Sequence, residues 1–187
     1  MSLWTNTFAL LLALNAGAAP LSLKDVRGRP VQPMEAATKK AAILFFITTD
    51  CPIANKFAPQ IQKLAARYAP HARCTLVYPD PDLTGAAIQK HLVDFGYGKL
   101  TAVHDHDHRL VLATGAEVTP EAVVVDARGR IVYRGRINNY YADFGKPRRV
   151  ITVHDLRDAL DAVIAGKPVA RPRTEAIGCY ITPLKSR

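Results

Sequence analysis

The sequence predicts a single α/β domain built on a central mixed β-sheet, with helices on both faces. Three observations support this fold class. Residues 41–48 are continuously apolar, as expected for a strand that is buried on both faces. A helix with apolar residues at helical spacing follows directly. The predicted elements then alternate as β-α-β-α-β-α-β-β-α, an order that is typical of a mixed sheet covered by helices.

The first third of the chain contains a hairpin, the buried strand and the helix. Residues 21–33 predict a short N-terminal β-hairpin extension, with Arg27 and Gly28 near its turn. Pro52 suits the first turn of the helix, because its missing N–H would have no partner there. Pro59 lies inside the same helix and is expected to kink it.

The later elements are separated by Gly and Pro at loop-like intervals. Predicted strands are 74–78, 100–104, 121–126 and 130–136, and predicted helices are 83–95 and 108–114. A polar, basic loop is expected over 138–150. Thr152 and Asp155 form a Thr-x-x-Asp capping box, which is expected to open a last helix that ends at Gly166.

The first 18 residues are typical of a signal peptide. Residues 8–14 form a short apolar core, and Ala16-Gly17-Ala18 supplies the small residues of a cleavage site. The apolar stretch is too short to span a bilayer; a retained interfacial helix or anchor is the alternative. We therefore expect a periplasmic or secreted protein, with a signal peptide at 1–18, a folded domain at 19–166 and an extended tail at 167–187.

The formal net charge of +9 is concentrated in two segments. Residues 128–149 hold seven Lys or Arg against one Asp, and residues 167–187 hold five against one Glu. Such a surface attracts nucleic acid, anionic lipid or an acidic partner. An exported protein rarely meets nucleic acid, so we expect a solvated basic face and no nucleic-acid partner. A weak contact with an anionic surface is the alternative.

Cys51 is the candidate reactive residue, because it stands between the buried strand and the helix. A helix N-terminus offers unpaired N–H groups and a partial positive charge, and both favour a nucleophilic thiolate. Thr48 lies three residues earlier and is placed to hydrogen-bond the thiolate or a bound oxyanion. Lys56 adds positive charge nearby, whereas Asp50 opposes the thiolate. The alternative, a buried and inert cysteine, fits these polar flanks poorly.

Three segments resemble the thioredoxin-like redoxins, which include the peroxiredoxins and exported thiol–disulfide oxidoreductases of the cytochrome-maturation type. Residues 48–59 resemble their active-site segment, and Val118-Thr119-Pro120-Glu121 resembles the loop of their cis-proline. Residues 126–135 resemble their terminal hairpin. The resemblance covers roughly residues 20–166 and implies a thioredoxin-like fold. It also implies that Pro120 packs beside the catalytic sulfur of Cys51.

The chain departs from each family pattern at one position. Ala54 replaces the second cysteine of a Cys-x-x-Cys motif, which removes the local resolving thiol. Leu44 replaces the proline of the peroxiredoxin Pro-x-x-x-Thr-x-x-Cys segment, and Arg134 or Arg136 is a candidate for the arginine that such a site needs. Asn55 replaces the second cysteine of the copper-delivery Cys-x-x-x-Cys pattern.

Cys179 is the candidate for the missing second thiol. It lies in the hydrophobic cluster Ile177–Ile181 of an otherwise polar tail, where Gly178 permits unusual backbone angles or a close approach. A tail thiol can reach an active site and resolve a sulfenic acid or a mixed disulfide. A static Cys51–Cys179 disulfide and an unpaired tail thiol are the alternatives. Cys74 begins an apolar strand and is interpreted as a core thiol.

His104, His106 and His108 would share one face of an extended strand, as in a metal site. The segment instead crosses a predicted strand-to-helix loop, where Asp107 is placed to cap the helix. We therefore interpret it as a surface loop, and predict no metal and no cofactor.

The sequence thus predicts an exported redoxin that acts by thiol chemistry at Cys51, with Cys179, Thr48 and Pro120 completing the site. Its partners would be exported protein thiols and disulfides, or peroxide, and the sequence does not decide between disulfide exchange and peroxide reduction. The alternatives are a module without catalysis that binds copper or a partner, and a structural domain locked by a Cys51–Cys179 disulfide.

Overall fold

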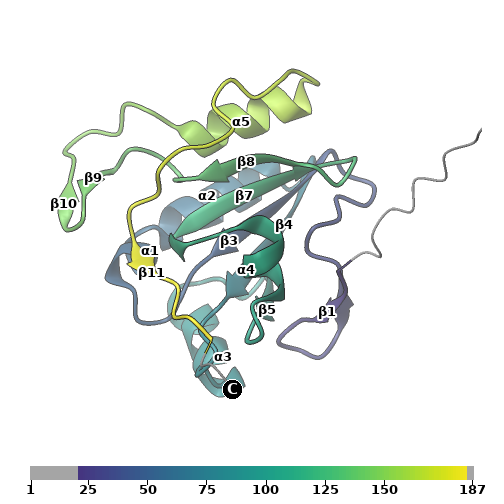
Figure 1. The fold of residues 1–187 in the computed structure, drawn as a ribbon, viewed down its shortest axis with the longest axis vertical. Coiled ribbons are helices and arrows are strands. Elements are labelled where there is room, and N and C mark those ends of the chain that lie inside the picture. The colour runs from purple at the N-terminus through teal and green to yellow at the C-terminus, as the bar shows by residue number, and fades with distance from the viewer. Residues whose placement is uncertain (1–20, 185–187) are drawn as a thin grey trace, which may run out of the picture.

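A five-stranded mixed sheet forms the centre of the molecule (Figure 1). The computed structural model describes residues 21–184, and the strand order is β5-β4-β3-β7-β8. The central β3 (Ala41–Phe46) runs parallel to β4 (Ala72–Tyr78), which runs parallel to β5 (Thr101–His104). On its other side β3 pairs antiparallel with β7 (Glu121–Asp126), and β7 pairs antiparallel with β8 (Ile131–Gly135). The predicted mixed central sheet is confirmed.

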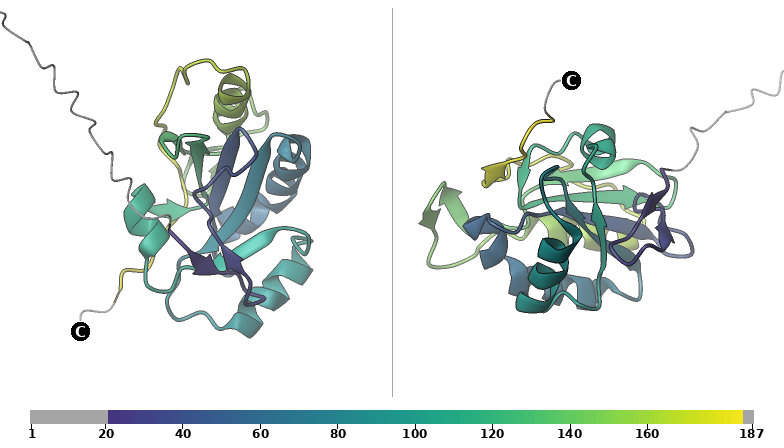
Figure 2. Two further views of the ribbon diagram at one scale, coloured as in Figure 1. Left: turned by 90° about the vertical axis from the view of Figure 1, so that its right-hand side faces the viewer. Right: turned by 90° about the horizontal axis from the view of Figure 1, so that it is seen from below.

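Helices cover both faces of this sheet, as predicted. Alternate side chains of β3 therefore pack in two separate core clusters, one on each face. Ile43 and Phe45 pack in one cluster with residues of α2 (Ala58–Tyr68), α3 (Gly85–Asp94) and α5 (Asp155–Ile164). Leu44 and Phe46 pack in the other cluster, with Leu110 of α4 (Arg109–Thr114). Figure 2 shows α4 on one side of the sheet and α2 on the other. The expected N-terminal hairpin, β1 (Leu23–Lys24) with β2 (Pro30–Val31), joins the α4 side.

The helix after β3 is interrupted and forms two helices, where the sequence predicted one kinked helix. α1 (Pro52–Lys56) ends at Phe57, and α2 begins at Ala58 with Pro59 in its first turn. Pro59 has no N–H to donate back into α1, so the break falls at Phe57, two residues before it. The short α1 therefore carries Cys51 at its N-terminus, at the edge of the sheet where β3 ends.

The C-terminal tail follows the sheet and then crosses to the end of the molecule that holds Cys51. It first runs along β8, where the N–H of Arg134 donates to Pro172 and the N–H of Thr174 donates to Arg134. It then forms β11 (Cys179–Tyr180), which pairs antiparallel with β6 (Val118–Thr119). The tail thus connects β8 to the strand that immediately precedes Pro120.

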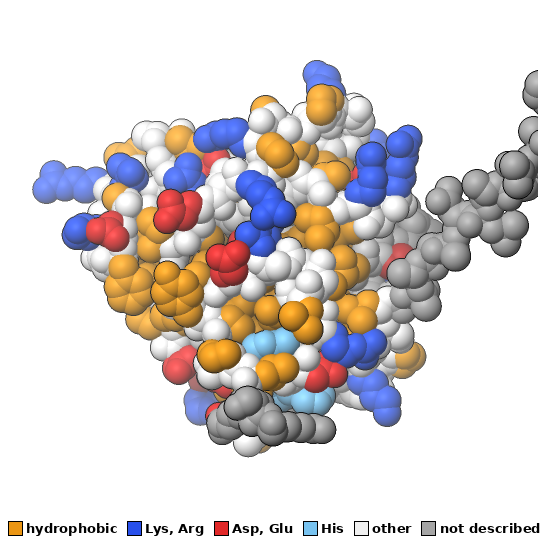
Figure 3. Space-filling view, in the orientation of Figure 1, with side chains coloured by type: hydrophobic (Ala, Val, Ile, Leu, Met, Phe, Trp, Pro, Cys, Tyr) orange, Lys and Arg blue, Asp and Glu red, His pale blue; other side chains and the backbone are white. Residues whose placement is uncertain are grey.

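The basic loop between β8 and α5 contains a small hairpin, β9 (Tyr141–Asp143) with β10 (Lys146–Pro147). Lys and Arg side chains gather over the upper part of the face shown in Figure 3, around this hairpin and α5.

The predicted capping box of the last helix is wrong. α5 begins at Asp155 with His154 as its N-cap, and no side chain caps it. The Thr152 hydroxyl instead accepts a hydrogen bond from Asn139 at 2.8 Å. Asp155 accepts one from Nε of Arg136 at 2.7 Å, so both residues are engaged by partners distant in sequence.

The predicted cap of α4 is also wrong by two residues. Asp107 is exposed, whereas the buried Asp105 accepts hydrogen bonds from the N–H groups of Leu110 at 3.0 Å and Val111 at 2.9 Å. His108 takes a left-handed conformation with φ of 56°, and this turn brings the helix start back to Asp105.

The predicted signal peptide at 1–18 lies outside the described residues. Between residues 21 and 184, no helix is long and apolar enough to cross a membrane.

Candidate active site

Cys51 caps the N-terminus of α1 and is buried, with 1% of its surface exposed. Its backbone is extended, with φ of −79° and ψ of 109°, and its sulfur accepts a hydrogen bond from the N–H of Ala54 at 3.4 Å. This N–H is one of the unpaired donors of the first helical turn. It supports negative charge on the sulfur, because a donor that faces a thiolate stabilises it.

The loop that contains Pro120 contacts the sulfur through the carbonyl of Thr119. The Thr119–Pro120 peptide bond is cis, as the resemblance to the redoxins implied. The Cys51 thiol donates a hydrogen bond to the carbonyl oxygen of Thr119 at 3.2 Å. The helix N-terminus and the cis-proline loop therefore contact the same sulfur atom, one as donor and one as acceptor.

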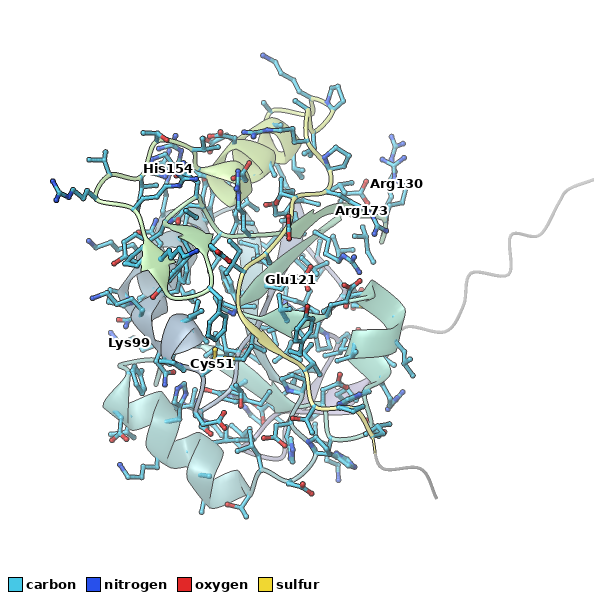
Figure 4. The ribbon with its side chains drawn as sticks, turned by 60° about the vertical axis from the view of Figure 1, so that its left-hand side comes forward. Cys51, Lys99, Glu121, Arg130, His154 and Arg173 are labelled. Carbon is cyan, nitrogen blue, oxygen red and sulfur yellow. The ribbon has the colours of Figure 1, made fainter. Side chains whose placement is uncertain are left out.

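Cys179 reaches this sulfur from the tail. Cys179 and Thr119 are direct partners in the β11–β6 pair. A Cβ added at Gly178 would lie 2.1 Å from the Thr119 carbonyl oxygen, so glycine is needed for this close approach. Figure 4 shows the tail passing beside Cys51 and Glu121.

The two thiols are neighbours. Burial raises the pKa of Cys179 to about 12, and a hydrogen bond with Cys51, the charge of Cys51 and the charge of Asp50 add to this shift. Cys51, Cys179 and Cys74 are all free thiols in the structure. The reduced protein therefore holds two thiols that line one cavity, on elements that are distant in sequence.

A cavity of about 110 Å³ opens beside the two thiols. Thr48 and Asp50 lie on one wall, and the Thr48 hydroxyl donates to the Asp50 carboxylate at 3.1 Å. Tyr180, of which 85% of the surface is exposed, stands at the cavity beside Cys179. The lining residues include two carboxylates but neither Lys nor Arg: Thr48, Asp50, Cys51, Pro79, Asp80, Thr119, Cys179, Tyr180, Ile181 and Thr182.

An aromatic cluster borders the site next to α1. The ring of Phe57 lies 6.0 Å from Tyr140 and 6.1 Å from Tyr141, measured between centroids. Burial, Tyr140 and the charge of Cys51 together raise the pKa of Tyr141. The β9–β10 hairpin thus brings an aromatic residue within electrostatic range of the Cys51 sulfur.

The two candidate arginines are engaged elsewhere. Arg134 pairs with Glu117 at 3.1 Å and with Glu121 at 3.4 Å, and Arg136 pairs with Asp155 at 2.7 Å. Neither lines the cavity beside Cys51.

Cys74 and the histidine segment lie outside the site. Cys74 is half-buried on β4 and packs against the core without being one of its fully buried residues, which only partly matches the predicted core thiol; burial raises its pKa to about 12. Nε2 of His104 and Nε2 of His108 each lie within hydrogen-bonding distance of a backbone carbonyl, at 2.9 Å and 2.8 Å. Among residues 21–184, no cluster of three or more His, Cys, Asp or Glu is arranged to hold a metal ion.

Sequence reasoning missed two parts of the site. Pro79 and Asp80 follow β4, and they line the cavity because β4 is the parallel neighbour of β3. The sequence could have predicted this, since parallel neighbouring strands end at the same edge of a sheet. The Asn55–His91 contact at 2.8 Å was not readable, because it joins α1 to a helix 36 residues away.

This combination of fold and site defines a thioredoxin-like thiol redox protein: a cysteine at a strand-to-helix junction faces a cis-proline loop on a mixed sheet. The chain belongs to the Redoxin family, whose match covers residues 14–146. A search of curated proteins finds no match.

Solved structures with the same fold cover most of the chain. An uncharacterized conserved protein from Geobacillus kaustophilus is 24% identical, with a TM-score of 0.76 over 91% of this chain and 92% of that chain. A hypothetical protein from Sinorhizobium meliloti 1021 is 26% identical, with a TM-score of 0.73 over 88% and 91%. A secreted Mycobacterium tuberculosis disulfide oxidoreductase homologous to E. coli DsbE is 19% identical, with a TM-score of 0.54 over 79% and 96%.

Proposed function

We propose that this protein is an exported thiol–disulfide oxidoreductase, in which Cys51 is the nucleophile and Cys179 is the resolving thiol. The observation that carries the proposal is the β11–β6 pairing, in which Cys179 is the direct partner of Thr119, the residue whose carbonyl accepts the Cys51 thiol. The partners are thiols and disulfides of exported proteins, and the chemistry needs no cofactor.

The exchange begins at Cys51. Its thiolate, supported by the Ala54 N–H, attacks one sulfur of a substrate disulfide, whose S–S bond breaks as the second sulfur leaves as a thiolate. Cys179 then loses its proton and attacks the Cys51 sulfur, which releases the first substrate sulfur. The substrate gains two electrons and the protein loses two, as a Cys51–Cys179 disulfide. An external dithiol reverses these steps and restores both thiols.

Disulfide exchange is favoured over peroxide reduction by the charge around the sulfur. Peroxide reduction needs a cation beside the reactive thiol, but the cavity presents Asp50 and Asp80, and both candidate arginines pair with carboxylates. The secreted disulfide oxidoreductase among the similar structures is consistent with this choice and with export.

Export is part of the same proposal. The apolar core at 8–14 and the Ala16-Gly17-Ala18 site support a cleaved signal peptide. An oxidising compartment also suits a protein whose working form cycles through a disulfide.

Peptide mapping of the intact protein tests this function. After treatment with glutathione disulfide, the parent is expected to yield a Cys51–Cys179 peptide pair. The Cys179→Ser variant is expected to stop at a mixed disulfide on Cys51, and Cys51→Ser is expected to form neither product. Cys74→Ser serves as the matched control and should behave like the parent.

Three results would contradict the proposal. Unreactive Cys51 would favour a structural or binding module. Sustained consumption of hydrogen peroxide without disulfide exchange would favour a peroxidase. Copper binding that is lost in Cys51→Ser would favour the metal-binding alternative.

A further inference from the structure

A chain of hydrogen bonds runs from the sheet through two helices to the loop before Cys51. The hydroxyl of Tyr78, the last residue of β4, lies 2.8 Å from Nδ1 of His91 on α3. Nε2 of His91 lies 2.8 Å from Oδ1 of Asn55 on α1. Nδ2 of Asn55 donates to the carbonyl oxygen of Thr49 at 2.9 Å.

The direction of every bond in this chain follows from its last member. The Thr49 carbonyl can only accept, so the Asn55 amide nitrogen donates and the Asn55 oxygen must accept. Nε2 of His91 therefore carries the proton. In a neutral imidazole Nδ1 is then the acceptor, and the Tyr78 hydroxyl donates to it. Only one histidine tautomer satisfies all the partners.

The surroundings hold His91 in this state. His91 is 5% exposed, and its ring packs 4.5 Å from Phe95 and 5.9 Å from Tyr97, between centroids. Burial lowers the pKa of His91, and this effect outweighs the opposing charge of Asp94. Tyr78 and His91 are buried and Asn55 is half-buried, and each of their polar side-chain atoms in the chain has a partner. Loss of one member therefore leaves a neighbour without its hydrogen bond.

We propose that Tyr78, His91 and Asn55 form a positioning relay that fixes the Thr49 carbonyl and thereby the aim of the Cys51 sulfur. The relay deepens the proposed function, because it concerns the same thiol. The Thr49 carbonyl belongs to the peptide that enters Asp50, so holding it fixes the backbone that places Cys51 as the N-cap of α1. That backbone directs the sulfur to the Ala54 N–H and the Thr119 carbonyl.

The first test reads the tautomer directly. ¹⁵N NMR of the reduced full-length protein at neutral pH is expected to show His91 neutral, with its proton on Nε2. The opposite tautomer would overturn the relay, because Nε2 could no longer donate to Asn55. A doubly protonated ring would also overturn it, because Nδ1 could no longer accept from Tyr78. This measurement needs no variant and does not depend on any activity.

The second test compares two substitutions of His91 that keep different halves of the relay. In His91→Gln the amide nitrogen can replace Nε2 and still donate to Asn55. In His91→Asn the amide oxygen can replace Nδ1 and accept from Tyr78, but the donor to Asn55 is lost. Both variants remove the aromatic ring. They are made with Cys74→Ser and Cys179→Ser, so that Cys51 is the single thiol.

The readout is the rate of Cys51 alkylation by iodoacetamide. His91→Asn is expected to slow alkylation by about tenfold, the effect of losing one buried hydrogen bond, whereas His91→Gln stays within about twofold of the parent. His71→Asn makes the same chemical change at an exposed histidine and should leave the rate unchanged. Thermal unfolding of each variant is measured in parallel.

The outcomes separate the relay from the proposed function. Equal rates for the Gln and Asn variants, or rates that merely follow their stability, would overturn the relay. A parent that is alkylated normally but forms no mixed disulfide with glutathione disulfide would overturn the proposed function, and the difference between Gln and Asn would still report on the relay.

Discussion

Replacing Gly178 with alanine tests how the tail brings Cys179 to Cys51. The added Cβ would lie 2.1 Å from the Thr119 carbonyl oxygen and 2.6 Å from its carbonyl carbon. Real side chains do not approach backbone this closely. Thr119 cannot retreat easily, because its carbonyl accepts the Cys51 thiol. The alanine is therefore expected to lift β11 away from β6.

The expected magnitude follows from the contacts that hold β11. Lifting it breaks the backbone pairing of Cys179 with Thr119 and the hydrogen bond from the Ile181 N–H to Glu117 at 3.0 Å. Each lost hydrogen bond contributes about 1 kcal/mol net, so the loss of roughly two weakens the docking of β11 on β6 by about 2 kcal/mol. This corresponds to an effective concentration of Cys179 at Cys51 that is about 30-fold lower.

The assay is the equilibrium of the Cys51–Cys179 disulfide in glutathione buffers of graded redox potential. Disulfide and dithiol forms are separated by mass after acid quenching and alkylation. Gly178→Ala is expected to shift the equilibrium constant about 30-fold toward the dithiol. Gly85→Ala is the matched control, since no atom lies within 4 Å of a Cβ at that position. An unchanged constant in Gly178→Ala would refute the reasoning that close approach at Thr119 places the resolving thiol.

Three further predictions follow from the same structure. Burial and Cys51 raise the pKa of Cys179 to about 12, so the rate at which iodoacetamide alkylates Cys179 in the reduced protein should keep rising up to pH 10. A rate that reaches a plateau near pH 8.5 would contradict this. Asp105→Ala should lower the free energy of unfolding by about 1–2 kcal/mol, because it removes the hydrogen bonds to the first N–H groups of α4. Asp107→Ala should change this free energy little, and urea denaturation of both variants measures the difference. In a bacterial expression host, the exported protein should begin at Ala19, which N-terminal sequencing checks; an uncleaved N-terminus would contradict the signal-peptide prediction.

Local patterns in the sequence were sufficient for the sheet and for the position of Cys51. The apolar run at 41–48 predicted a strand, and all residues of β3 are buried. Pro52 and the helical spacing after it predicted the helix that Cys51 caps. The resemblance around Thr119 and Pro120 located the cis bond. Each of these features depends on a few adjacent residues, so the sequence alone contains the necessary information.

Contacts between distant segments were not readable in the same way. Asp105 caps α4 because His108 turns into a left-handed conformation, and nothing in the His-Asp repeat distinguishes Asp105 from Asp107. Asp155 looked like half of a capping box, but a buried carboxylate is better stabilised by the guanidinium of Arg136 than by a backbone N–H. Such choices are made by tertiary packing.

Under the proposed function, the position of the second thiol distinguishes this site from one with both cysteines in a single motif. Ala54 contributes its N–H to the Cys51 sulfur but no thiol, so α1 alone can hold the thiolate without resolving a mixed disulfide. Under the proposed function, resolution requires β11 to lie on β6, and a substrate chain held at Cys51 needs space on the same side of the Thr119 carbonyl. The tail and the substrate therefore compete for the approach to one sulfur. The strength of tail docking, which depends on Gly178 and on the anchoring of Thr174 to β8, then sets how long the mixed disulfide survives.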